Sequence, residues 1–288
     1  MKRIVPLAAL LLVFACAKKK QTAEAPPTTT TQEAPPAVET QPPATNTAPQ
    51  NATTLAANAP IPASGVLLWL AADDATATNG NVTVWQSTQV PTSARPLHEN
   101  QTPALVAKAL NGHAVVRFDG TDQQLISDID IGPQRMPVGT IISVFRSATA
   151  DASPLRKLYG DDDGGYDRAV GLDDRAAKTN YTVFTGNGDE PYFQLAANAA
   201  YITVDQYTTT DFTGWVNGAA TPVITPANWG DDALANLYLG GTGTVYSEFW
   251  NGDLAEIIVY NRKLSDEERA KVVDYLAKKY GVTLQPSS

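Results

Sequence analysis

The chain has 288 residues, of which 21 are Lys or Arg and 30 are Asp or Glu, so its formal net charge is -9 at pH 7. An acidic surface repels phosphate backbones, and no basic stripe interleaved with aromatic residues runs through the sequence, so we expect no nucleic-acid partner. Cys16 is the only cysteine, which excludes an internal disulfide.

The first fifteen residues have the layout of an export signal. Two basic residues precede an apolar run that ends at Ala15 and is too short to span a hydrocarbon core. The run closes with the letters VFAC, which resemble the lipobox of bacterial lipoproteins, where the cysteine is acylated and becomes the new N-terminus. We therefore predict a signal peptide over residues 1–15 and a lipid on Cys16. The alternative is an ordinary secretory signal in which Cys16 is incidental.

Residues 16–64 are predicted to form a disordered tether behind that lipid. Between Ala17 and Ser64 there is no Phe, Trp, Tyr or Gly, while Pro, Thr, Ala and Gln dominate. Such a segment buries too little apolar surface to offset the loss of chain entropy on folding. By resemblance to the lipoprotein sorting rule, the absence of Asp after Cys16 implies an exported protein anchored in the outer membrane or at the cell surface of a Gram-negative bacterium.

From Gly65 onward the sequence predicts one all-β domain, residues 65–288. Short runs rich in Val, Ile, Tyr, Phe and Trp alternate with turn residues, as is typical of strands. No alternation of helix and strand runs is present, which argues against a doubly wound parallel sheet. Asn-Gly pairs favour tight hairpins because both residues tolerate positive φ, so pairing should be mostly antiparallel. Five such pairs begin at Asn79, Asn111, Asn187, Asn217 and Asn251.

One α-helix is predicted near the end of the chain. Ser265 can cap its N-terminus, and Glu268 can complete the capping box. Apolar residues then recur at helical spacing as far as Tyr280, before Gly281 ends the helix. The apolar stripe contains Leu276, and it needs a sheet to cover.

Four segments of the domain carry a family resemblance. They read NGHAVVRFDG from Asn111, WVNG from Trp215, WNGDLAEIIVYN from Trp250 and LSDEE from Leu264. Together they resemble bacterial laminin G-like domains of the concanavalin A-like lectin/glucanase superfamily. The resemblance implies a two-sheet antiparallel jelly-roll sandwich with one C-terminal α-helix and with binding sites on the concave face or in the rim loops. It does not imply one ligand, because this fold carries lectins, hydrolases and adhesion modules.

A sugar site needs an aromatic ring against the apolar face of the sugar and polar side chains to orient the hydroxyl groups. Aromatic residues in loop-like positions are the candidates, each with a packing role as the alternative. Trp69, Trp85 and Trp215 lie in predicted strands and are expected in the core. The candidate ligand-binding residues are Tyr166, Tyr192, Trp229, Tyr246 and Trp250.

An acidic stretch predicts a metal site. Asp161, Asp162, Asp163 and Asp167 surround two glycines and concentrate the oxygen ligands that calcium prefers. Their spacing does not follow the EF-hand pattern. We expect calcium there, with a solvated acidic turn as the alternative, and no other cofactor.

We expect no catalytic residues. The resemblance implies that hydrolases of this superfamily use a Glu-x-Asp-x-x-Glu string, which this chain lacks. In the nearest pair, Asp253 and Glu256, the odd spacing places the two carboxylates on opposite faces of a regular strand. His98 and His113 lack the spacing of metal ligands or of a catalytic triad.

These features together predict a surface-anchored lipoprotein whose non-catalytic module binds a polysaccharide or glycoconjugate, with the membrane reached through the lipid. Two alternatives remain at this point. One is a structural or adhesive lipoprotein that binds a protein partner, and the other is a divergent glycoside hydrolase.

Overall fold

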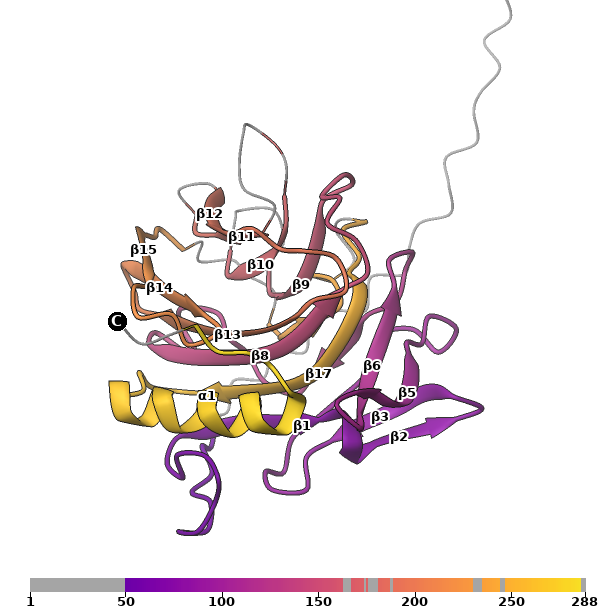
Figure 1. Ribbon diagram of the computed structural model, residues 1–288, viewed down its shortest axis with the longest axis horizontal. Coiled ribbons are helices and arrows are strands. Elements are labelled where there is room, and N and C mark those ends of the chain that lie inside the picture. Colours follow the sequence, from indigo (N-terminus) through magenta and orange to yellow (C-terminus); the bar gives the residue numbers. More distant parts are fainter. Residues whose placement is uncertain are drawn as a thin grey trace, which may run out of the picture. The chain divides into compact units, whose positions relative to one another are not determined.

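The computed structural model describes residues 50–162, 167–173, 175, 181–186, 189–229, 235–243 and 247–285, which all belong to one structural unit, Pro43–Ser288. Within these residues the chain forms seventeen strands, every pair of them antiparallel, and one α-helix (Figure 1). The predicted all-β class with a single C-terminal helix is confirmed. The elements are β1 (Val66–Ala71), the 3-10 turn η1 (Ala72–Asp74), β2 (Ala75–Thr78), β3 (Asn81–Gln86), β4 (Ser93–Pro96), β5 (Ala104–Leu110), β6 (His113–Asp119), β7 (Leu125–Ser127), β8 (Gly139–Ser147), β9 (Arg156–Gly160), β10 (Ala169–Leu172), β11 (Tyr181–Phe184), β12 (Asp189–Phe193), β13 (Ala200–Tyr207), β14 (Asp211–Val216), β15 (Val223–Pro226), β16 (Tyr238–Leu239), β17 (Asn251–Tyr260) and α1 (Asp266–Tyr280).

The strands form one continuous hydrogen-bonded sheet that curls on itself. From one edge, the order is β15, β14, β13, β8, β17, β6, β5, β3, β4, β7, β16, β9, β10, β11 and β12, with β1 beside the second half of β17 and β2 beside β3. The two halves of the sheet also approach each other across the interior, where the hydroxyl of Tyr192 on β12 lies 3.0 Å from the carbonyl of Trp215 on β14. The result is a nearly closed barrel or sandwich.

Strand β8 shows why its sequence is apolar throughout. Ile141 and Phe145 point into the core enclosed by the curled sheet, whereas Ile142 and Val144 point to a second core under the helix. Alternate residues of a strand face opposite sides, so a strand buried on both sides needs apolar residues at nearly every position. We call the helix-side surface of β1, β6, β17, β8 and β13 the outer face.

Helix α1 covers part of the outer face, below β17 and β8 in Figure 1. Ser265 accepts a hydrogen bond from the N–H of Glu268 and the capping box is complete, while Gly281 ends the helix with φ of 67°. Leu276 is fully buried under the helix. No helix among the described residues is long and apolar enough to cross a membrane.

Residues that precede Gly65, within the segment predicted to be tether, pack on the domain. Ile61 is fully buried, and Thr53 pairs with Val66 through two backbone hydrogen bonds. Leu55 joins Ile61 in the second core. These few apolar residues suffice because β1 and α1 already provide the surface on which they pack.

Strand β17 contains a bulge that corrects one sequence-based expectation. Asp253 pairs with Arg146 and Glu256 with Val144, so that Ala255 is an extra residue between the two pairs. Residues opposite each other in a sheet share a face, and Arg146 and Val144 lie two positions apart on β8. Asp253 and Glu256 therefore lie on the same outer face, not on opposite faces as regular alternation predicts.

A fully buried carboxylate lies in the core between the two halves of the sheet. Asp205 on β13 accepts hydrogen bonds from the hydroxyls of Tyr159 at 2.6 Å, Tyr192 at 2.7 Å and Thr203 at 3.2 Å. Burial raises the pKa of Asp205 to about 6, although these three hydrogen bonds oppose the shift. The group is thus held by donors from both halves of the sheet.

Candidate functional site

Two of the five aromatic residues predicted as sugar platforms are buried and therefore not free to stack on a ligand. Trp250 is fully buried, and Tyr192 is 6% exposed, with its hydroxyl bound to Asp205. Trp229 is half-buried and donates its indole N–H to the carbonyl of Thr208 over 2.6 Å. Tyr166 and Tyr246 lie outside the described residues.

The three tryptophans expected in the core are buried. Trp85 belongs to the core inside the curled sheet, whereas Trp69 and Trp215 belong to the second core beneath the helix. Each of these two is 8% exposed. The core prediction holds, but Trp69 also reaches the surface described below.

The acidic stretch predicted to bind calcium is only partly described, because Asp163 lies outside the described residues. Asp161 is fully buried, and neither of its carboxylate oxygens accepts a hydrogen bond from another described residue. Burial raises its pKa well above the usual value. Asp162 forms an ion pair with Lys157. In this part of the chain, no group of three or more His, Cys, Asp or Glu side chains is placed to hold a metal ion. Calcium stays a prediction.

A cleft of ≈430 Å³ opens on the outer face beside α1. Four segments enclose it: the chain before β1, strand β1 with the η1 turn, the loop after β3 and the C-terminal half of the helix. Its lining includes the side chains of Trp69, Asp73, Asp74, Tyr275 and Lys279. An aromatic pair and two carboxylates thus share one concave surface.

Two aromatic rings form one wall of the cleft. The rings of Trp69 and Tyr275 meet edge to face, with centroids 6.5 Å apart and an interplanar angle of 88°. The indole N–H of Trp69 donates to Glu256 over 2.6 Å, which fixes the orientation of the ring. Tyr275 is half-buried, so its ring is the more accessible of the two.

Glu256 lies fully buried beneath this wall. Besides Trp69, it binds the ammonium group of Lys279 at 2.7 Å and the hydroxyl of Tyr280 at 2.7 Å. Burial alone would lower the pKa of Lys279, but the charge and hydrogen bond of Glu256, together with the nearby Tyr275 and Asp73, raise it. The buried carboxylate is therefore paired, and it ties β17 to the helix.

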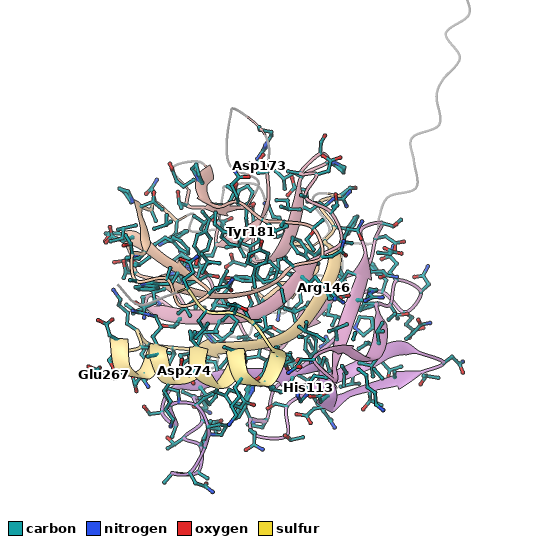
Figure 2. The ribbon with its side chains drawn as sticks, in the orientation of Figure 1. His113, Arg146, Asp173, Tyr181, Glu267 and Asp274 are labelled. Carbon is teal, nitrogen blue, oxygen red and sulfur yellow. The ribbon has the colours of Figure 1, made fainter. Side chains whose placement is uncertain are left out.

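Asp73 is the most highly constrained carboxylate on the rim of the cleft. It accepts hydrogen bonds from the N–H of Ala114 at 2.8 Å and from Nδ1 of His113 at 2.7 Å, and Lys279 lies 3.8 Å away. Burial would raise its pKa, but these donors and charges together lower it. His113 lies beside the C-terminal end of α1 (Figure 2), with its ring 5.4 Å from that of Tyr280. Asp73 is thus ionised, and its partners hold its carboxylate in one orientation.

Sequence reasoning missed this cleft because its residues come from four separate segments. One local signal was present, since Asp73 and Asp74 follow directly after the apolar run of β1. Binding and catalytic residues lie disproportionately in the loops that follow such rigid elements. The sequence position of Tyr275, at the edge of the apolar stripe of α1, does not predict whether its ring is exposed. The angle at which α1 docks on the sheet decides this.

No protein-family model matches the chain, and no curated protein matches its sequence. Among solved structures, the chain is similar to domain 4 of AbnA, a GH43 extracellular arabinanase from Geobacillus stearothermophilus, in complex with arabinotriose. The identity is 11% and the TM-score 0.51, over 73% of this chain and 97% of that domain.

Two further similarities are weaker. A GH54 α-L-arabinofuranosidase shares 11% identity at a TM-score of 0.49, over 69% of this chain and 51% of that one. Trypanosoma rangeli sialidase, in complex with the inhibitor DANA, shares 14% identity at a TM-score of 0.45, over 74% of this chain and 33% of that one. This chain therefore spans about half the length of the first and a third of the second. At such identities the likeness is one of fold.

These comparisons correct the expected function. A solved structure that resembles the domain with a TM-score above 0.5 is a domain of a GH43 arabinanase, which is a glycan-processing enzyme. The expectation of a non-catalytic binding module, made from the missing Glu-x-Asp-x-x-Glu string, is therefore overturned. A missing string excludes one arrangement of carboxylates on one strand, not every arrangement that a fold can present.

Proposed function

We propose that the chain takes part in glycan processing and that the cleft beside α1 holds the glycan. The observation that carries the proposal is the combination, in one concave surface, of the accessible Tyr275 ring with the carboxylates of Asp73 and Asp74. Sugar rings stack their apolar faces on aromatic side chains, and carboxylates orient their hydroxyl groups. The likeness of fold to the arabinanase domain that was solved with arabinotriose supports the same ligand class.

The two carboxylates also suit hydrolysis. Glycosidases use one ionised carboxylate as base or nucleophile and a second carboxyl group as proton donor. The lowered pKa of Asp73 keeps it ionised, which fits the first role. Asp74, which follows it and accepts a hydrogen bond from Thr88 over 3.2 Å, is the second carboxyl group on the same wall.

Variants of the cleft test this function. We expect Asp73→Asn to lower the kcat for release of reducing sugar from arabino-oligosaccharides by about a hundredfold or more, the usual effect of losing a base. Tyr275→Ala should raise KM about tenfold, because it removes the stacking face while leaving the carboxylates. Asp274→Asn, which changes an exposed residue of the same helix, is the matched control and should leave both constants unchanged.

The proposal fails on either of two results. One is that the full chain neither binds nor cleaves oligosaccharides from a panel of arabinan, xylan and galactan. The other is that Asp73→Asn and Tyr275→Ala process a cleaved substrate as the unchanged chain does, which would place the activity elsewhere.

We further propose that the fold is a laminin G-like jelly roll of the concanavalin A-like type. The all-antiparallel pairing and the packed C-terminal helix support this finer assignment.

We also propose that the chain is exported and held on the membrane by a lipid on Cys16. The basic, apolar and cysteine-containing leader supports it, because several acyl chains at about 0.8 kcal/mol per buried methylene give firm anchoring. Cells that express the full chain should incorporate labelled palmitate into it, and Cys16→Ala should abolish the label and release the protein from the membrane fraction. Labelling that survives in the Cys16→Ala chain would refute the anchor.

A further inference from the structure

A second hollow, of ≈250 Å³, lies on the outer face without any lining residue from α1. Two arginines from neighbouring strands line it, Arg117 on β6 and Arg146 on β8, on either side of Asp253 on β17. Figure 2 shows Arg146 where β8 and β17 continue past the C-terminal end of the helix. The hollow is therefore distinct from the cleft that contains Tyr275.

Asp253 holds both guanidinium groups in fixed orientations. Its carboxylate accepts from Arg117 Nε at 2.6 Å and Nη2 at 3.1 Å, and from Arg146 Nε at 3.0 Å and also from Nη2. The Asp253 side chain is 4% exposed, whereas Arg117 and Arg146 are 46% and 22% exposed. A buried anion thus anchors two cations that remain accessible to solvent.

The two guanidinium groups keep hydrogen-bonding capacity for a ligand. Each arginine turns its Nε and Nη2 edge toward Asp253, and neither Nη1 group bonds to another of the described residues. Arginine N–H groups in a fixed plane match the two oxygens of a carboxylate or sulfate. Because Asp253 already restricts both side chains, little rotamer entropy is lost when a ligand binds.

The charge of the hollow also favours an anion. Two arginines share one carboxylate, which leaves a local charge of about +1 on a chain whose net charge is -9. Asn198 and Asn251 line the same hollow and add amide donors. These are the polar groups that orient hydroxyls around an acidic group on a sugar ring.

We propose that this arginine pocket, formed by Arg117, Arg146, Asn198 and Asn251, binds the carboxylate or sulfate group of an acidic sugar residue. The proposal rests on the proposed function in that the ligand is a glycan, but it uses residues that the cleft does not share. The chain would thereby prefer acidic over neutral glycans.

The test measures binding of three oligosaccharides of equal length to the full chain by calorimetry. An oligogalacturonate carries carboxylates, a sulfated galactan oligosaccharide carries sulfates, and a neutral galactan oligosaccharide carries neither. We expect at least one acidic probe to bind at least tenfold more tightly than the neutral one, and the stronger of the two identifies the oxyanion. Added salt should weaken that probe and leave the neutral one unchanged.

Two arginine variants locate the site. Arg146→Gln and Arg117→Gln should each weaken the acidic probe at least tenfold and the neutral probe less than twofold. Arg95→Gln is the matched control, because Arg95 is 56% exposed and pairs with Asp128 outside the pocket. The melting temperature of each variant shows whether it folds. If Arg146→Gln does not fold, Arg117→Gln tests the proposal alone, because Arg117 is the more exposed of the two.

Equal binding of all three probes to the unchanged chain overturns the proposal, as does unaltered acidic binding in both arginine variants. A different result would refute the proposed glycan binding in the cleft beside α1. In that case Tyr275→Ala leaves neutral binding intact while the arginine variants still lose the acidic probe.

Discussion

Leu276→Asp is expected to lower the melting temperature of the domain by about 10 °C or more. Leu276 is fully buried between α1 and the outer face. Losing a buried leucine costs about 2–5 kcal/mol, and placing a carboxylate in the same apolar site adds the cost of desolvation. In a domain of this size each kcal/mol shifts the melting temperature by about 2–4 °C.

Thermal unfolding followed by circular dichroism measures this effect. Lys278→Asp, a change to the same residue at an exposed position two residues on, serves as the control and should cost about 1 kcal/mol or less. If the melting temperature of Leu276→Asp stays within about 2 °C of the unchanged chain, the helix is not docked and the cleft beside it does not exist.

Asp205 should make the domain less stable as the pH rises from about 4 to about 6. Burial raises its pKa from 3.8 to about 6 in the folded chain, so the folded state binds this proton more tightly than the unfolded state. Stability from that proton is present below the unfolded pKa and is lost as the carboxyl ionises. A difference of about two units corresponds to about 3 kcal/mol at neutral pH.

Asp205→Asn tests the effect, because asparagine cannot ionise and can still bond to the surrounding hydroxyls of Tyr159 and Tyr192. Urea unfolding of both proteins at several pH values gives the difference in unfolding free energy. This difference should change by about 3 kcal/mol between acidic and neutral pH in favour of Asp205→Asn. A difference that does not vary with pH would show that Asp205 titrates normally.

The fold was largely accessible from sequence because its signals are local. The hairpin at Asn217 has the positive φ that Asn-Gly allows, and the helix follows its Ser265 cap and Gly281 end as expected. The segment before Gly65 was harder. Its few apolar residues, such as Ile61, are ordered only because tertiary surfaces receive them.

The candidate sites were not accessible in the same way. Trp250 has the sequence context of a loop aromatic, yet it is fully buried because the curled sheet closes over it. The arginine pocket needs Arg117, Arg146 and Asp253 to meet across three strands, and strand register cannot be deduced from composition.

The extra residue Ala255 divides β17 into two stretches of opposite parity. Before it, even-numbered Leu254 points into the core; after it, odd-numbered Ile257 and Val259 do so. In a substitution scan along this strand, the positions that tolerate polar residues should therefore switch at the bulge. We expect them at odd-numbered positions up to 253 and at even-numbered positions from 256, because these side chains face outward. One added residue thus lets a single strand present two acidic anchors on the same outer face, Asp253 to the arginine pair and Glu256 to the helix.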